Sequence, residues 1–290
     1  FRLRKYIHRE NIIFSELHIK RHIKPVLKVF SFSVVTSIYL QLNTVLLGFL
    51  KNALAVGYFA AATKVMQMLL TMSACLGSVM MPRASHLIAE NKEDEFNRLI
   101  QKSYDFTLAI ALPMTIGLIF CAPSLITALC GVKFEHSILP SQIIAPIILM
   151  VAISNVFGIQ VLFPKGKINI VTLCCGIGAV ADLILNLCLI PFFSYIGTSI
   201  AYLGAEVATT VSMYFIGRRY IPIIYFKKSH LTYALGCIVM ALALYGISLL
   251  QLPTLSILLL QGCCGVLAYF IILCICKDEM LVQILSKIKR

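Results

Sequence analysis

Charged residues are scarce in this sequence of 290 residues: Asp, Glu, Lys and Arg make up 13% of it, whereas hydrophobic residues make up 60%. Soluble domains carry about 25% charged residues, so the composition excludes a soluble globular protein. Together with a mean hydropathy of +0.92, it predicts an all-α, polytopic membrane helix bundle. The net charge of +13 does not indicate a nucleic-acid partner, because the basic residues lie in loops between apolar stretches, as the positive-inside rule describes.

The motifs of several enzyme classes are also missing. The sequence contains no phosphate-binding P-loop, no HExxH and no GxSxG. Its 11 cysteines lie in or beside apolar stretches, without the spacing of a zinc site. We therefore expect no enzyme, no metal and no bound cofactor, and we expect the cysteines to behave as small hydrophobic residues.

Eight apolar stretches are long enough to cross a hydrocarbon core of about 30 Å as helices. They cover residues 29–50, 53–81, 105–130, 141–163, 168–190, 196–217, 231–250 and 254–276. The predicted division of the chain is a basic linker (1–28), a six-helix lobe (29–217), two additional membrane helices (218–276) and an amphipathic tail (277–290). An apolar stripe within residues 82–104 predicts a short helix lying along the membrane surface.

Basic residues in the loops predict the orientation. Of the 25 Lys and Arg residues, 22 fall in alternate loops on one side of the membrane, Lys51 and Lys133 fall on the other, and Lys64 lies within an apolar stretch. Cytoplasmic loops collect Lys and Arg. We therefore expect both ends of this chain to be cytoplasmic.

Three ionisable residues lie deep in apolar stretches: Lys64, Asp182 and Glu206. At 1.5 Å per residue, they lie about 12–16 Å from the outer ends of their helices, near the bilayer midplane. Charges at this depth usually pair or line a wet cavity, so we expect Asp182 and Glu206 to face each other, share a proton or pair with Lys64. The alternative is a neutral pair of carboxyls that only orients the helices.

Amide side chains and one arginine complete the set of candidates. Amides in membrane helices either join helices or contact a ligand, and Arg83 ends the second apolar stretch. The candidate substrate-binding residues are Lys64, Asn43, Gln41 and Arg83, and the candidate ion-coupling or helix-pairing residues are Asp182, Glu206 and Asn186.

Two regions of the chain carry a resemblance to a known family. The first contains Asn43 to Gly48, Val56 to Val65 and Met81 to Arg83, and the second contains Asp182 to Pro191 and Ile196 to Ala201. In their order and spacing they resemble polysaccharide-repeat exporters of the Wzx type, the O-antigen and capsule flippases of the multidrug/oligosaccharidyl-lipid/polysaccharide superfamily. The resemblance covers essentially the whole chain. It implies two six-helix lobes followed by two more helices, of which this chain supplies the second lobe and the appended pair.

The resemblance also implies a function. Such a protein moves undecaprenyl-pyrophosphate-linked oligosaccharide repeat units from the inner to the outer leaflet of the bacterial cytoplasmic membrane, coupled to H⁺ or Na⁺. Its expected partners are the lipid-linked oligosaccharide, membrane lipid, an N-terminal lobe of the same chain and a polysaccharide polymerase. Lys64 is then expected to contact the anionic part of the cargo.

Other functions remain open from the sequence. Within the superfamily they are a lipid II flippase and a cation-coupled multidrug exporter, although Lys64 disfavours the net-acidic cavity expected of a drug exporter. In other classes they are a membrane-embedded polysaccharide polymerase and a non-transporting scaffold. A polymerase should carry a larger outer loop than residues 131–140 provide.

Overall fold

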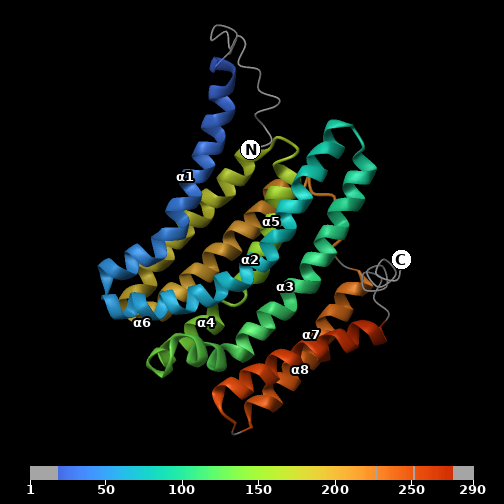
Figure 1. The fold of residues 1–290 in the computed structure, drawn as a ribbon. Coiled ribbons are helices and arrows are strands. Elements are labelled where there is room, and N and C mark those ends of the chain that lie inside the picture. Colours follow the sequence, from blue (N-terminus) through green and yellow to red (C-terminus); the bar gives the residue numbers. More distant parts are fainter. Residues whose placement is uncertain (1–18, 226, 251, 277–290) are drawn as a thin grey trace, which may run out of the picture.

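The computed structural model describes residues 19–225, 227–250 and 252–276, and every regular element within them is a helix (Figure 1). The predicted tail (277–290) and the first 18 residues of the predicted linker lie outside the described residues, and residues 19–28 form the start of α1. The elements are α1 (Ile19–Leu50), α2 (Ala53–Ala89), α3 (Glu93–Cys130), η3 (Val132–Ser137), α4 (Ile138–Ile144), α5 (Ile147–Asn155), η4 (Val156–Leu162), α6 (Ile168–Gly217), α7 (Lys228–Ser248) and α8 (Thr254–Ile275).

The predicted all-α membrane architecture is confirmed. Five helical segments are long and apolar enough to cross a membrane, and a bent pair, Val132–Ile144 with Ile147–Leu162, forms a sixth. One of the five is α6, whose 50 residues cover two of the predicted stretches. The helix α1 contains a shorter apolar segment, Gln41–Leu50. The helices are therefore consistent with about eight predicted spans.

The long helix α6 turns back on itself at Ser194, which has φ 52° and ψ −130°. Two glycines allow its halves to approach closely. A Cβ atom at Gly197 would lie 2.6 Å from the carbonyl oxygen of Leu189, and one at Gly178 would meet the hydroxyl of Thr209 and lie 3.2 Å from the carbonyl oxygen of Ala205. Such contacts exclude a larger side chain, so the halves before and after Ser194 form an antiparallel hairpin.

The connection between α2 and α3 differs from the prediction. The helix α2 begins after Asn52, whose side chain accepts a hydrogen bond from a backbone N–H of the first turn. It continues through Pro82 to Ala89, and α3 begins at Glu93. The separate surface helix predicted within residues 82–104 is therefore wrong, because those residues extend the two spanning helices beyond the apolar stretches.

The fourth span is bent by 44° between α4 and α5. Pro146 lies at the bend and lacks the N–H that would continue the helical hydrogen bonds. The span ends in a π-helical turn, η4, where the buried Gln160 accepts a hydrogen bond of 2.5 Å from Ser103 of α3. This bond ties the irregular end of the span to its neighbour.

Two apolar cores hold the bundle together. One core joins α1 and α2 to α3, α4 and α5 through residues such as Leu47, Phe59 and Ile144. The other joins α3 and η4 to α7 and α8, with Phe157 and Tyr233 among its largest side chains. Figure 1 shows α7 and α8 beside α3, on the opposite side of the bundle from α1. The appended helix pair is thus part of the same packed body as the lobe.

Candidate functional site

A buried polar cluster joins α1 to the first half of α6. Asn43 of α1 donates a hydrogen bond of 3.0 Å from Nδ2 to Oδ2 of Asp182. Asn186 donates from Nδ2 to Asn43 Oδ1 at 2.9 Å and to Asp182 Oδ1 at 3.0 Å. The three residues are at most 2% exposed. We call Asn43, Asp182 and Asn186 the amide–carboxylate cluster.

The sequence places these three side chains on facing helices. Asp182 and Asn186 are four residues apart, so they share one face of α6, and α6 packs against α1. Three acceptors surround the Nδ2 group of Asn186, because the backbone carbonyl of Asp182 also lies 2.9 Å away. An amide has two hydrogens, and the buried Oδ1 of Asn186 has no hydrogen-bond partner among the described residues. The cluster therefore holds more oxygen atoms than its donors can satisfy.

Glu206 lies on the second half of α6 and is 5% exposed. It follows the buried Tyr202 by one helical turn, and Gly178, four residues before Asp182, lies close to Ala205 and Thr209 on either side of Glu206. The α6 hairpin therefore brings both predicted carboxylates to the same region of the bundle. Asp182, however, takes its hydrogen bonds from Asn43 and Asn186.

Lys64, Gln41 and Arg83 all have exposed side chains. Lys64 takes part in no ion pair within the part of the chain that the structure describes. The predicted pairing of Lys64 with Asp182 is therefore wrong, because Lys64 points away from the core of the bundle. Lys64 and Arg83 are also about 28 Å apart along α2, at 1.5 Å per residue, so they lie at different depths.

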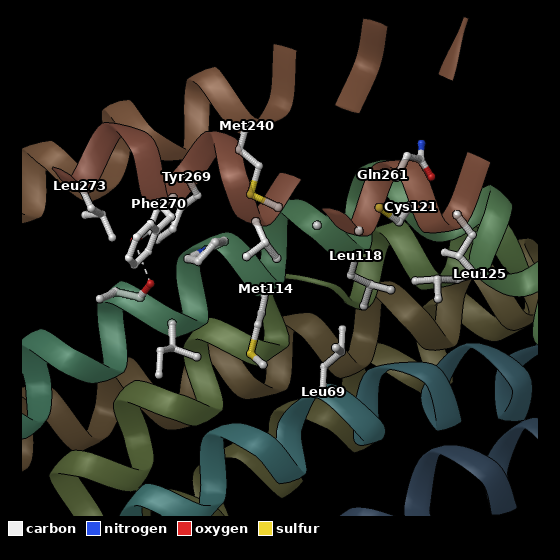
Figure 2. A pocket seen from close by; sticks show the side chains of 17 residues that line it. Leu69, Met114, Leu118, Cys121, Leu125, Met240, Gln261, Tyr269, Phe270 and Leu273 are labelled. Atoms are coloured by element: carbon white, nitrogen blue, oxygen red, sulfur yellow. Dashed lines mark hydrogen bonds between the residues drawn. The ribbon is translucent and has the colours of Figure 1, made fainter. Parts of the chain in front are cut away.

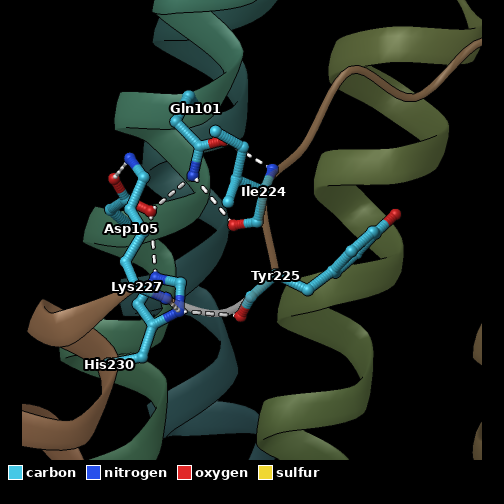
Figure 3. Close-up of polar contacts among 6 residues, drawn as sticks. All are labelled: Gln101, Asp105, Ile224, Tyr225, Lys227 and His230. Atoms are coloured by element: carbon cyan, nitrogen blue, oxygen red, sulfur yellow. Dashed lines mark hydrogen bonds and ion pairs between the residues drawn. The ribbon is translucent and has the colours of Figure 1, made fainter.

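A second polar cluster was not predicted from the sequence (Figure 3). Asp105 of α3 accepts hydrogen bonds of 2.8 Å from Lys227 Nζ and 2.7 Å from Gln101 Nε2, and its Oδ1 lies 3.0 Å from His230 Nε2. We call Asp105, Gln101, Lys227 and His230 the Asp105 cluster. Its sequence signal was weak, since Asp105 and His230 each lie at the edge of an apolar stretch and 125 residues apart.

An apolar pocket of about 480 Å³ lies between α3, α7 and α8, with Leu69 of α2 at its edge (Figure 2). Tyr269 donates a hydrogen bond of 2.8 Å to the carbonyl oxygen of Ala109, and Ser124 donates one of 2.9 Å to Gln261 Oε1. These two bonds fix α8 on α3, and nearly all the remaining wall is hydrocarbon. The pocket suits an aliphatic chain.

Known proteins match this chain in both sequence and fold. A family described as "Polysaccharide biosynthesis protein" matches residues 5–139. A candidate O-antigen transporter of Escherichia coli (strain K12) is 25% identical over 199 residues, which are 68% of this chain and 47% of that protein. A candidate O-antigen transporter of Shigella dysenteriae is 27% identical over 181 residues, or 61% of this chain and 44% of that protein.

Solved structures share the fold. The lipid II flippase MurJ in an inward closed conformation superposes with a TM-score of 0.74 at 17% identity, over 97% of this chain and 59% of that one. A multidrug resistance MATE family transporter of the MOP superfamily, in an outward-facing conformation, gives a TM-score of 0.60 at 17% identity, over 76% of this chain and 53% of that one.

This chain spans about half the length of the curated relatives that it matches. Its helices and these relatives agree on a multi-pass membrane protein. The resemblance predicted from the sequence motifs is confirmed: the chain is similar to O-antigen transporters and, over residues 5–139, to a polysaccharide biosynthesis family. It shares its fold with a lipid II flippase and with a multidrug transporter.

Proposed function

We propose that this chain supplies one lobe and two further helices of a flippase for undecaprenyl-pyrophosphate-linked oligosaccharides in the bacterial inner membrane. The observation that carries the proposal is the exposed ammonium of Lys64, about 16 Å from the start of the spanning helix α2. An unpaired charge at this depth needs water or an anion. A pyrophosphate passing through a wet cavity provides that anion, and the names of the relatives favour a transporter over an enzyme.

A path for the cargo follows from the two exposed cations of α2. Arg83 and Lys64 lie at two depths of one helix, so an anionic group can meet them in succession. The apolar pocket between α3 and α8 offers a surface of hydrocarbon for the lipid part of the cargo. Keeping the tail in an apolar environment and the pyrophosphate near cations lowers the cost of moving the polar part through the membrane.

The amide–carboxylate cluster is the proposed site of the coupling ion, H⁺ or Na⁺. Its surplus of oxygen atoms is the chemistry that a proton or a hard cation requires. Rotation of the Asn186 amide by 180° would add Oδ1 to the oxygens of Asp182 and Asn43. The cluster joins α1 to α6 across the lobe, so binding there can change how these helices pack.

The remaining parts of the proposal concern partners and orientation. We propose that a second lobe covers the exposed sides of α1 and α2 and completes an alternating-access pathway, and that a polysaccharide polymerase uses the exported units. We place both ends of this chain in the cytoplasm. That orientation requires the turns at Lys51 and Pro191 to share one side of the bundle, and Lys51 Nζ donates a hydrogen bond of 2.9 Å to the carbonyl of Pro191.

The test is complementation of a strain lacking the full-length protein. Lys64→Ala should lower glycan export about 10- to 150-fold, the equivalent of one charged hydrogen bond of about 1.5–3 kcal/mol, and Lys64→Arg should keep part of it. Gln67→Ala, at another exposed position of α2, is the control. Wild-type export by Lys64→Ala at normal protein level would refute this role, and accumulation of lipid II instead of the repeat unit would favour a lipid II flippase, the function of its structural neighbour.

A further inference from the structure

A second pocket, of about 750 Å³, lies where α3, α5, η4 and the second half of α6 meet residues 223–225, and the proposed transport path does not use it. Four aromatic rings form much of its wall: Tyr104, Phe157, Tyr214 and Tyr225. Their neighbouring centroids are 5.2 to 6.3 Å apart. We call it the tyrosine pocket.

The Asp105 cluster fixes the backbone that carries one of these rings. Gln101 accepts a hydrogen bond of 2.8 Å from the N–H of Ile224 and donates one of 3.3 Å to its carbonyl, and His230 Nδ1 lies 2.9 Å from the carbonyl oxygen of Tyr225. Figure 3 shows the Tyr225 ring directed away from Asp105. The segment is therefore held in place while its aromatic side chain faces the pocket.

The tyrosine pocket contains polar groups without partners. The hydroxyl groups of Tyr104, Tyr214 and Tyr225 form no hydrogen bond with any other residue that the structure describes. Tyr104 lines the pocket with a side chain that is 6% exposed, and Tyr214 and Tyr225 are half-buried. A ligand that carries oxygen acceptors would satisfy them.

The surroundings of the pocket are apolar on one side and basic on the other. Val211, Phe215 and Ile224 line it with side chains that are largely exposed, as expected of a wall that faces lipid. Arg218 and Arg219 follow the last residue of α6 in a turn, and they lie in the chain between Phe215 and Ile223, both of which line the pocket. Both arginines are exposed, and neither takes part in an ion pair within the described residues.

We propose that the tyrosine pocket binds one anionic phospholipid of the leaflet on the Arg218 side. An acyl chain lies against Val211 and Phe215, the arginines hold the phosphate, and tyrosine hydroxyls donate to the phosphate or ester oxygens. Basic residues between membrane helices favour anionic headgroups, and the arginine guanidinium matches phosphate geometry. A free phosphate would leave the apolar wall uncovered, and a zwitterionic lipid would not match the two positive charges.

The test uses the full-length protein in vesicles of phosphatidylcholine. The 290 residues contain no tryptophan, so Ile224→Trp places a fluorescent reporter in the pocket, and its signal is the difference from the parent protein. Bromine-labelled phosphatidylglycerol should quench it at a mole fraction about five- to thirtyfold lower than bromine-labelled phosphatidylcholine, as expected for one or two arginine contacts. Leu242→Trp, at an exposed position of α7, should show no preference.

The arginines provide the decisive comparison. Arg218→Gln with Arg219→Gln should remove the preference, whereas the matched pair Arg98→Gln with Lys102→Gln, also exposed, should keep it. Unchanged quenching at the Leu242→Trp position shows that each variant is inserted and folded. Equal quenching by both lipids, a preference that survives the double arginine variant, or no quenching by either lipid because protein covers the pocket would each overturn the proposal.

Discussion

Asp182 and Asp105 each organise a polar cluster in this bundle, but their partners differ. The hydrogen bonds to the Asp182 side chain come from two neutral amides, whereas Asp105 contacts Lys227 and His230. A carboxylate that is paired with a fixed cation remains ionised and holds its helices together. A carboxylate among amides can change state by binding a proton or a cation. The comparison separates a candidate for ion coupling from a structural attachment.

The depth of the two clusters supports the same distinction. Asp182 is fully buried in the middle of a spanning segment, where a charge has to be neutralised or hydrated. Asp105 is partly exposed near the end of its span and joins α3 to the start of α7. We therefore expect changes at Asp182 to affect transport and changes at Asp105 to affect stability.

The largest expected effect is on transport by Asp182→Asn. Without the carboxylate, the site loses its affinity for the coupling ion, so export should fall about 10- to 150-fold, the range for a charge-assisted contact of about 1.5–3 kcal/mol. The folded protein should reach its normal level, because asparagine keeps a similar shape. Transport in reconstituted vesicles checks this, with Asp105→Asn as the comparison. An unchanged rate would leave Asp182 with a structural role only.

The next effect is on stability, in Asp105→Ala. Removal of the carboxylate leaves Lys227 and His230 without their partner, at a cost of about 2–3 kcal/mol for hydrogen bonds to a charged group. We expect the thermal midpoint to fall by roughly 5–10 °C. Asp94→Ala, at an exposed position near the start of α3, is the control and should change little. Equal midpoints for the two variants would contradict the attachment role.

A smaller effect is expected in Glu206→Gln. Glu206 is buried beside Tyr202 in the α6 hairpin, so it can contribute to a shared proton without being the main site. The variant should transport, with a flatter dependence on pH than the parent protein. Rates measured across the pH range would show this. Parent-like profiles in both Glu206→Gln and Asp182→Asn would rule out proton coupling through these carboxylates.

The smallest effect is expected at the exposed ion pair of Glu90 and Lys92, which are 2.9 Å apart. The hydrogen bond from Lys92 lowers the pKa of Glu90. The ion pair therefore contributes to stability at pH values above the ordinary pKa of glutamate. This contribution is lost as the pH falls through the lowered pKa of Glu90. Because exposed pairs contribute little, Glu90→Gln should leave the thermal midpoint at neutral pH unchanged. A shift as large as that of Asp105→Ala would contradict the distinction between exposed and partly buried pairs.

The candidate residues are predicted from their depth within apolar stretches of the sequence. Depth alone does not identify the residues with which they pair. The grouping of Asp182 with Glu206 on one hairpin follows from the short connection between two apolar stretches, and the close approach of the two halves of α6 at Gly178 brings both to one region. The pairing with Lys64 failed because depth does not say which side of a helix faces the core. Asp105 was overlooked because a carboxylate at the edge of a span is common in membrane proteins. Its partner His230 lies 125 residues away in the sequence, so no local pattern links the two residues.

Hydrophobicity, length and motif spacing are local properties, so the class of the protein, the approximate number of its spans and the family that it resembles follow from the sequence alone. Three features could not be predicted without the fold: Asn43 meets Asp182 across 139 residues, Lys64 is exposed, and Tyr225 helps to form a pocket. These outcomes depend on the packing of distant helices, which determines the side of each helix that is covered and the side that is left free.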